Sequence, residues 1–346
     1  MNFCINMNKH LVFYTIKSLL QIRCFFLVLL SLFVGMFFLA GCTYQSRKAY
    51  GIRSAYYWST SWTDIPKSYT FTNHLNRLYV RYFDVVLDEG RVPVPNATFS
   101  FNSSHEFVDK ENAKSDISRV SDSLEIVPVI FIVNEVMRKP QPQLAQQILD
   151  RVLQMNATND IHRVHELQID CDWTNSTRQH FFSMLQQLHT LASKHHITLS
   201  ATIRLHQLMQ SAPPVDRGVL MVYNTGDFTR RSCEHPILDM RDINPYLDYL
   251  SDYSLPLTAA YPLFAYRIAF RGNHYLGILH ADDDLPLLLG DTVITRKSTA
   301  EEVLQVQKKL MAIRPDINDE VIVFDLSKNH LSYYKSKDYE KVYHLH

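Results

Sequence analysis

The chain has 346 residues, of which 46% are hydrophobic, and its 35 basic residues balance its 35 acidic residues. A neutral chain with no local basic stripe lacks the electrostatic footprint of a nucleic-acid-binding protein. The five cysteines are too few to hold a disulfide-rich fold together. About 300 residues beyond the N-terminal segment are enough for one large domain.

The N-terminal segment reads as a targeting sequence. Lys17 and Arg23 precede an uncharged apolar run over residues 25–39, which is short for a membrane span but typical of a signal peptide. Leu39-Ala40-Gly41-Cys42 follows, and it resembles the lipobox of bacterial lipoproteins. This resemblance implies that residues 1–41 are removed and that Cys42 carries fatty acyl chains such as palmitate. An ordinary N-terminal anchor helix is the alternative, and translation could start at Met7.

We therefore expect a signal peptide over residues 1–41, a lipidated cysteine and polar tether over residues 42–52, and a folded domain over residues 53–346. Acyl chains on Cys42 would anchor the domain to the bacterial cell envelope, in the outer membrane, with the domain in the periplasm or at the cell surface. Only Cys171 and Cys233 then remain in the domain, where a single bridge between them stays open.

Along the domain, short β-rich segments alternate with helical patterns, which favours a parallel sheet covered by helices. The sequence predicts strands at residues 54–58, 77–83, 126–133, 166–171, 198–203, 219–223, 257–261 and 321–324. Apolar residues at helical spacing predict helices over 143–156 and 177–195, and Ser298-Thr299-Ala300-Glu301 is a capping-box pattern that opens a third helix.

The predicted strands fit an α/β fold, a single (β/α)₈ barrel of the TIM type. The alternative, an open doubly wound sheet, would be expected to carry a Gly-rich phosphate-binding turn, which is not found. Two long segments, residues 88–122 and 271–297, interrupt the alternation. We expect them to shape a substrate cleft at the barrel mouth.

The most informative stretch is residues 167–174, where an apolar strand ends in Asp170 and Asp172. Residues two apart in a strand share a face, so both carboxylates point the same way. Active sites of (β/α)₈ barrels gather at the C-terminal ends of the strands, which places the pair in a candidate active site. The alternative is a capping or arginine-binding role.

The other predicted strand ends supply a mixture of carboxylates, amides, arginines and aromatic rings. A carbohydrate suits this mixture, because sugars present apolar C–H faces to rings and hydroxyls to polar groups. The expected substrate-binding residues are Trp58, Trp62, Arg81, Trp173, Arg204, His206, Gln207, Asn224, Tyr261 and Asp325.

Glycoside hydrolysis needs an acid and a second carboxylate or substrate group. Asp172 is the expected key carboxylate, with Asp170 tuning its pKa by like-charge repulsion. Asp84 and Glu135, at the ends of neighbouring predicted strands, are the candidates for the second carboxylate. No cofactor is expected. His162-x-x-His165-Glu166 has the wrong order for a His-Glu-x-x-His metal motif, so no metal site is expected either.

Two resemblances add to this reading. Residues 169–174 are similar to the Asp-x-Asp-x-Glu signature of the family 18 chitinase-like glycosidases, and residues 221–224 to their Met-x-Tyr-Asp motif. This implies catalytic roles for Asp170, Asp172 and Tyr223. Thr174, however, stands where the family has its catalytic Glu. The chain also resembles the DUF3142-like group of Bacteroidetes lipoproteins, notably at residues 79–84, 199–207 and 213–218. That resemblance implies a glycosidase-like barrel without an established activity.

Three hypotheses follow. The first is a membrane-tethered glycoside-hydrolase-like barrel acting on a polysaccharide or cell-envelope glycan, with Asp172 as its key carboxylate. The second is a catalytically inactive barrel that binds glycan, which Thr174 favours. The third is a scaffold lipoprotein, which would expose large apolar patches in place of an acidic aromatic cleft.

Overall fold

The computed structural model describes residues 51–62, 74–101, 124–279 and 285–344. Residues Gly51–His346 form a compact unit with their own hydrophobic core. The predicted signal peptide and Cys42 lie outside the described residues, as does the tether up to residue 50. Among the helices that are described, none has the length and apolar character needed to cross a membrane.

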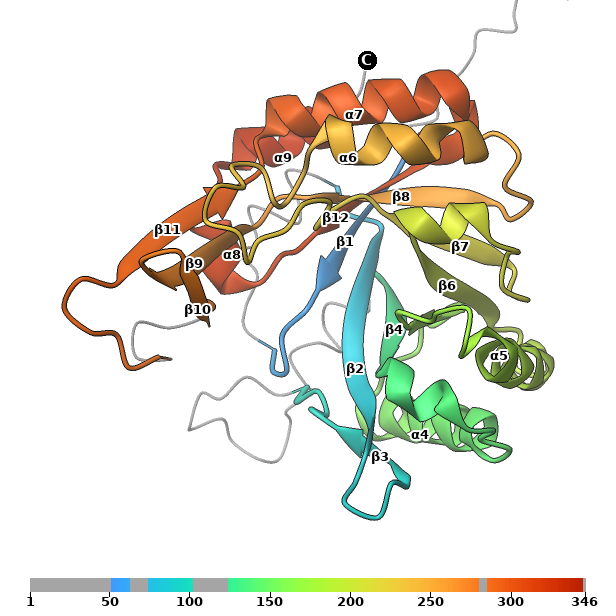
Figure 1. Cartoon of the computed structure of the whole chain (residues 1–346). Helices are drawn as coiled ribbons and strands as arrows, with labels where there is room; N and C mark the ends of the chain where they lie inside the picture. Colours follow the sequence, from blue (N-terminus) through green and yellow to red (C-terminus); the bar gives the residue numbers. More distant parts are fainter. Residues whose placement is uncertain (1–50, 63–73, 102–123, 280–284, 345–346) are drawn as a thin grey trace, which may run out of the picture. The chain divides into compact units, whose positions relative to one another are not determined.

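Eight parallel strands form a closed barrel, so the fold class predicted from the sequence is confirmed (Figure 1). β1 pairs with both β2 and β12, which closes the ring. Each strand overlaps one of the predicted segments. In chain order they are β1 (Ile52–Tyr57), β2 (Arg77–Leu87), β4 (Glu125–Ile132), β5 (Glu166–Asp170), β6 (Thr198–Arg204), β7 (Arg217–Met221), β8 (Leu257–Pro262) and β12 (Glu320–Phe324).

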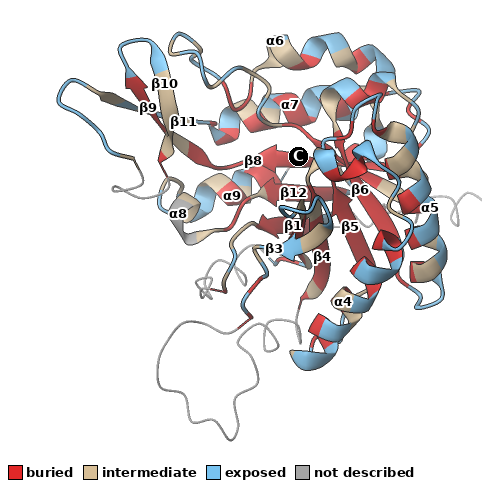
Figure 2. Ribbon diagram, turned by 60° about the horizontal axis from the view of Figure 1, so that its bottom comes forward, coloured by how far each residue is buried: buried red, intermediate tan, exposed pale blue. Residues whose placement is uncertain are grey.

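Helices pack around the barrel and bury their apolar faces on the strands (Figure 2). The long helices are α4 (Leu144–Thr158), α5 (Arg178–Ser193), α7 (Ala300–Ile313) and α9 (Ser336–Tyr343). Shorter turns of helix are η1 (Asn134–Arg138), η2 (Leu205–Met209), α6 (Met240–Ile243), η3 (Asn244–Tyr249), η4 (Pro315–Asn318) and α8 (Lys328–Leu331). The three predicted helices correspond to α4, α5 and α7.

The capping box of α7 lies one residue later than the sequence pattern suggested. Thr299, not Ser298, is the N-cap: its hydroxyl accepts from the Glu302 N–H at 3.2 Å, and the Glu302 carboxylate accepts from the Thr299 N–H at 2.8 Å. Ser298 instead donates to the Pro262 carbonyl at 2.8 Å. Both registers of the sequence match the pattern, and the packing of Ser298 against the end of β8 selects the second.

A small antiparallel sheet is inserted between β8 and α7. It comprises β9 (Ala265–Arg271), β10 (His274–Leu279) and β11 (Thr292–Lys297), with β9 in the middle. In Figure 1 this sheet projects away from the barrel. A further short strand, β3 (Pro93–Asn96), pairs antiparallel with the end of β2.

The barrel interior is polar at the end where the strands begin, which we call the lower end. Arg217 pairs with Glu166 at 3.0 Å, Arg77 pairs with Glu125 at 2.8 Å, and both arginines also reach Glu320. Above this layer, the buried Tyr56 hydroxyl donates to Gln168 Oε1 at 2.5 Å. Paired charges and bulky side chains therefore fill the lower end of the barrel. Space for a cavity is left at the opposite end, where the strands terminate.

Candidate functional site

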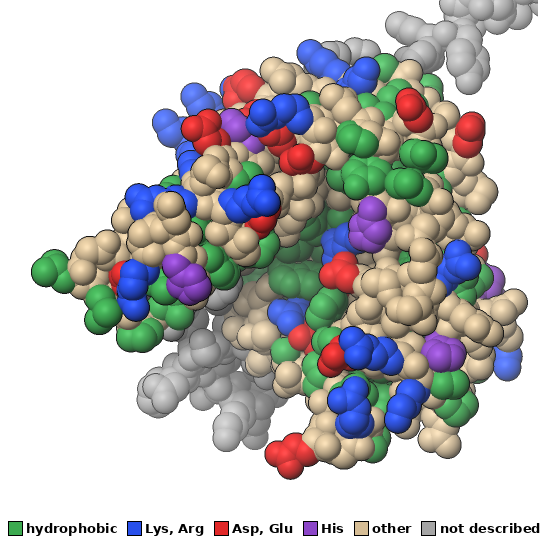
Figure 3. Space-filling model, viewed as in Figure 1, with side chains coloured by type: hydrophobic (Ala, Val, Ile, Leu, Met, Phe, Trp, Pro, Cys, Tyr) green, Lys and Arg blue, Asp and Glu red, His purple; other side chains and the backbone are tan. Residues whose placement is uncertain are grey.

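A cavity of about 930 Å³ opens at the C-terminal end of the barrel strands. Figure 3 shows the molecule hollowed at its centre, between the inserted sheet and the barrel. Side chains from most barrel strands and from the segment after β7 line this cavity, which we call the cleft. They include Trp58, Arg81, Phe131, Asp170, Asp172, Arg204, His206, Tyr223, Asn224, Arg241, Asp242, Tyr246, Phe264, Tyr266, Phe324, Asp325 and His330.

Asp170 and Asp172 face the cleft together, as the strand period predicts. Asp170 is buried and accepts from Thr202 Oγ1 at 2.6 Å and from Arg204 Nη2 at 3.2 Å. The Asp172 side chain is 57% exposed and accepts from Arg204 Nε. One guanidinium from β6 thus ties both carboxylates of the β5 end together.

Burial raises the pKa of Asp170, and Arg204 and Thr202 act in the opposite direction. Burial on its own would lower the pKa of Arg204, but Asp170, Tyr223 and Asp172 outweigh it and raise that pKa. Arg204 therefore stays positively charged under all ordinary conditions. It supplies a fixed cation at the floor of the cleft.

Arg81 and Asp84 of β2 form a second ion pair near the cleft. Arg81 Nε donates to Asp84 Oδ1 at 2.8 Å, and its guanidinium lies 5.3 Å from the ring centroid of Trp58. The register of β2 against β4 shifts between Arg81 and Phe83, which marks a β-bulge. Tyr82 and Phe83 consequently both pack in the outer core, and Asp84 turns back toward Arg81.

Phe324 stands at the centre of an aromatic cluster beneath the cleft. Its ring centroid lies 4.8 Å from that of Tyr223, 5.5 Å from Phe264, 5.6 Å from Tyr56 and 5.8 Å from Trp58. We call these five rings the aromatic floor: four of them line the cleft, and Tyr56 is fully buried and does not. Burial raises the pKa of Tyr223, so its phenol remains neutral. Rings of this kind offer a flat apolar surface beside polar groups.

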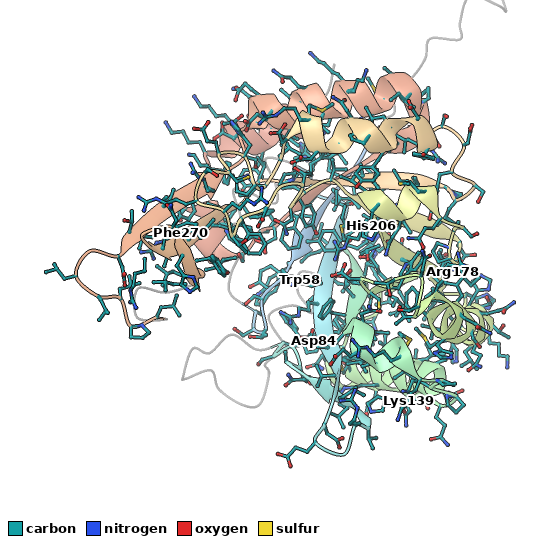
Figure 4. The ribbon with its side chains drawn as sticks, viewed as in Figure 1. Trp58, Asp84, Lys139, Arg178, His206 and Phe270 are labelled. Carbon is teal, nitrogen blue, oxygen red and sulfur yellow. The ribbon has the colours of Figure 1, made fainter. Side chains whose placement is uncertain are left out.

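Polar side chains stand around the rim. His206 is exposed and lines the cleft from the start of η2, and Figure 4 labels it across the hollow from Trp58. The Tyr266 hydroxyl donates to Asn224 Oδ1 at 3.1 Å, which joins the inserted sheet to the end of β7. Asp325 also lines the cleft, where its Oδ1 accepts from the Ser327 N–H and hydroxyl at 2.9 and 2.8 Å.

Three aromatic residues that the sequence suggested for sugar binding lie elsewhere. Trp62 packs on Tyr57 at 4.9 Å in the outer core. Trp173 is fully buried and stacks against Phe181 of α5. Tyr261 points outward and donates to Asn318 Oδ1 at 2.7 Å. Trp173 and Tyr261 each lie one residue out of phase with the inward side chains of their strands, so they face the helices.

Three polar candidates also fail to line the cleft. Gln207 is fully buried and bonds to backbone, accepting from the Arg204 N–H at 2.8 Å and donating to the Trp173 carbonyl at 3.0 Å. Glu135 is exposed and paired with Arg138 at 3.6 Å. Asp84 is buried against Arg81, near the cleft but not in its lining. Gln207 is thus a positioning residue that fixes the β5 and β6 ends.

Thr174 lies in the turn before α5. Its backbone N–H donates to Thr177 Oγ1 at 2.9 Å, and its hydroxyl lies 2.9 Å from Ser176 Oγ. Thr177 in turn donates to Asn134 Oδ1 at 2.7 Å. Thr174 is exposed and does not line the cleft. A hydroxyl in this turn cannot supply the proton that a carboxylic acid would.

Several lining residues are absent from the predicted site. Phe324 ends the predicted strand over residues 321–324, and Phe264, Tyr266 and Tyr246 lie outside the predicted strands. The described parts of the two long segments, residues 88–122 and 271–297, contribute no lining side chain. The wall comes instead from residues 241–246, after β7.

Within the described residues, no group of three or more His, Cys, Asp or Glu side chains is placed to hold a metal ion. Cys171 is buried and Cys233 is half-buried, and both are free thiols. The bridge that the sequence left open is therefore not formed.

No protein-family model matches the chain, and no curated protein matches it in sequence. The resemblance to the DUF3142-like lipoproteins is thus not confirmed. Solved structures do share the fold. The spore cortex-lytic enzyme SleL of Bacillus cereus is 12% identical with a TM-score of 0.52, over 84% of this chain and 73% of that one.

Chitinases give similar values. The C-terminal domain of a putative chitinase from Desulfitobacterium hafniense is 10% identical with a TM-score of 0.53, over 85% of this chain and 98% of that one. Catalytic domain 2 of the Group II chitinase of Ostrinia furnacalis, in complex with penta-N-acetylchitooctaose, is 12% identical with a TM-score of 0.53, over 86% of this chain and 96% of that one. The chain therefore has the barrel fold of the chitinase-like enzymes.

Proposed function

We propose that this chain is a membrane-tethered, glycoside-hydrolase-like barrel that binds a polysaccharide or cell-envelope glycan, with Asp172 as the key carboxylate of its cleft. The carrying observation is the arrangement of Asp172 and the aromatic floor in one cleft at the C-terminal end of the barrel. The floor can carry the apolar face of a sugar ring while the half-exposed carboxylate accepts from its hydroxyl or amide groups. Neighbouring structures described as chitinases and a cortex-lytic enzyme support a glycan as the ligand class.

Of the two ways of acting on a glycan, the geometry favours binding. Hydrolysis needs a carboxylic acid placed at the leaving oxygen. The family position for that acid holds Thr174, which is tied into a turn. The two substitute carboxylates expected from the sequence, Asp84 and Glu135, are each paired with an arginine and do not line the cleft.

Hydrolysis remains the second candidate because of one observation. Asp170 and Asp325 are buried carboxyls at the cleft, and burial raises the pKa of both. A carboxyl with a raised pKa is the kind of group that can deliver a proton near neutral pH. Each is held by neighbours, Asp170 by Thr202 and Arg204 and Asp325 by Ser327. Those partners favour the charged form, which opposes a role as proton donor.

The membrane tether belongs to the same proposal. It is supported by the apolar run over residues 25–39 and by Leu39-Ala40-Gly41-Cys42 in the sequence. A doubly or triply acylated Cys42 would hold the barrel stably at a bilayer. Radiolabelled palmitate incorporated into the full chain, but not into a Cys42→Ala variant, would support it; equal labelling of both would contradict it.

The test of the cleft uses the barrel from Thr43 with a panel of bacterial and host polysaccharides, including chitooligosaccharides. Binding is measured by titration calorimetry and cleavage by release of reducing ends, for the parent, for Asp172→Asn and for Asp150→Asn as an exposed control on α4. We expect binding by the parent and by Asp150→Asn, at least tenfold weaker binding by Asp172→Asn, and no release. Release that Asp172→Asn abolishes would establish the hydrolase instead. Equal binding by all three proteins would contradict the role of Asp172.

A further inference from the structure

The inserted sheet carries an exposed apolar tip far from the cleft lining. Leu287, Leu288 and Leu289 are 38%, 60% and 107% exposed, and Val293 nearby is 37% exposed. Together they are four of the nine large hydrophobic residues exposed in the described part of the chain. Figure 3 shows hydrophobic side chains at the far end of the projecting sheet. We call residues 287–289 the leucine tip.

The leucine tip is held by a defined turn. The Asp291 N–H donates to the Leu288 carbonyl at 3.0 Å, and Gly290 has a φ of 97°, as a type II turn requires at its third position. The Leu288 N–H donates to Asp291 Oδ2 at 2.7 Å. These two hydrogen bonds hold the turn in one conformation, in which the side chain of Leu289 is exposed to solvent.

An ion pair with the neighbouring strand fixes this turn to the sheet. Arg271 of β9 donates from Nε and Nη2 to the two Asp291 oxygens at 2.8 and 2.9 Å. On the other side, Leu285 packs so closely over Gly277 of β10 that a Cβ there would lie 2.8 Å from Leu285 Cδ1. Two strands of the inserted sheet thus hold leucines away from the hydrophobic core, although exposed leucines lower the solubility of a protein.

We propose that the leucine tip is a membrane-contact site that inserts into the surface of a lipid bilayer. The hydrophobic side chains lie at the end of the projecting sheet, where the flat surface of a bilayer can reach them (Figure 3). The choice of a lipid rests on the proposed tether: the nine residues from Thr43 to Gly51 reach at most about 30 Å, which keeps the barrel close to the membrane that holds Cys42. Arg271 and Asp291 pair with each other, so the test uses vesicles of a lipid without net charge.

The test uses the barrel from Thr43, which lacks the predicted signal peptide and the acylated cysteine, with phosphatidylcholine vesicles. Co-sedimentation is compared for the parent, for Leu287→Ser/Leu288→Ser/Leu289→Ser, and for Val92→Ser/Met209→Ser as a control with exposed apolar residues elsewhere. We expect the triple variant to lose at least about tenfold in partition, since three leucine side chains leave the apolar phase. The control should match the parent.

A second measurement places the leucine tip in the lipid. In Leu289→Trp, the new indole should shift its emission to shorter wavelength on vesicles and be quenched by brominated acyl chains. No binding by the parent, or equal binding by the triple variant, would overturn the proposal. So would a loss of self-association in the triple variant with no effect on vesicles, which would assign the leucine tip to a second copy. Glycan binding is a separate readout, so its failure would leave this test intact.

Discussion

Removing Arg204 should expose how the cleft is held together. Arg204 at the end of β6 is the charged partner of Asp170, which is 3% exposed and ends β5. Breaking a buried ion pair from one side costs about 3 to 5 kcal/mol, because the remaining charge is buried without compensation. We therefore expect Arg204→Met to lower the free energy of unfolding by about this amount at pH 7.

The loss should depend on pH in a definite direction. Burial already raises the pKa of Asp170 in the folded state, and removing Arg204 takes away an influence that lowers it. A carboxyl whose folded pKa lies above its unfolded value binds more protons when folded, so stability falls as pH rises through that window. Arg204→Met should thus recover part of its lost stability between pH 7 and about pH 4, relative to the parent.

Urea denaturation at pH 7 and pH 5 measures both effects, provided that the slope with denaturant is unchanged. Asp170→Asn/Arg204→Met should be more stable than Arg204→Met at pH 7, because it leaves no buried charge. Arg241→Met is the control: this rim arginine has an 82% exposed side chain, so its loss should leave the free energy of unfolding close to that of the parent. A cost below about 1 kcal/mol for Arg204→Met, or one that does not change with pH, would refute the reasoning.

Three further outcomes follow from the same contacts. Phe324→Ala removes the ring in contact with four others, so glycan affinity measured by calorimetry should fall at least tenfold, while Phe324→Tyr should retain binding. Tyr82→Phe loses a buried hydrogen bond to Asn156 of α4, so urea denaturation should show a cost of about 1 to 2 kcal/mol with glycan affinity unchanged. Thr299→Ala should cost about 1 kcal/mol in the same assay through the lost N-cap of α7, and a cost near zero would contradict the assigned cap.

Much of the fold could be predicted because two features of the sequence identify each barrel strand. Each of the eight is a short apolar segment, and each begins or ends at polar residues that the parallel arrangement gathers at one end. The same logic brought Asp170, Asp172, Arg204 and Tyr223 into one cleft. The placement of these four residues follows from local sequence patterns and does not depend on packing between segments far apart in the chain.

Trp173 and Tyr261 differ from the prediction for one physical reason. Both lie near a strand end, but the two-residue period of the strand turns their side chains away from the mouth. Along β8, every second residue from Thr258 faces inward, so Pro262 faces inward and Tyr261 faces outward. The same two-residue period along β12 places Phe324 inward. That period identifies the centre of the aromatic floor and excludes Tyr261.

Other features could not have been read from periodicity. The bulge at Tyr82 shifts the phase of β2 by one residue, and only the pairing with β4 reveals it. The wall from residues 241–246 comes from short helical turns after β7, which have no regular pattern. Glu135 illustrates the converse, because it follows a strand end and yet turns to solvent on η1.

The central claim is that a glycan lies on the aromatic floor beside Asp172. A crystal structure of the barrel soaked with the oligosaccharide that binds it most tightly tests this directly. We predict a sugar ring stacked on Phe324 and Tyr223, with one of its hydroxyl or amide groups within hydrogen-bond distance of the Asp172 carboxylate, and an intact glycosidic chain. A sugar bound elsewhere, such as the surface groove between α4 and α5, or one that makes no contact with Asp172, would contradict the account.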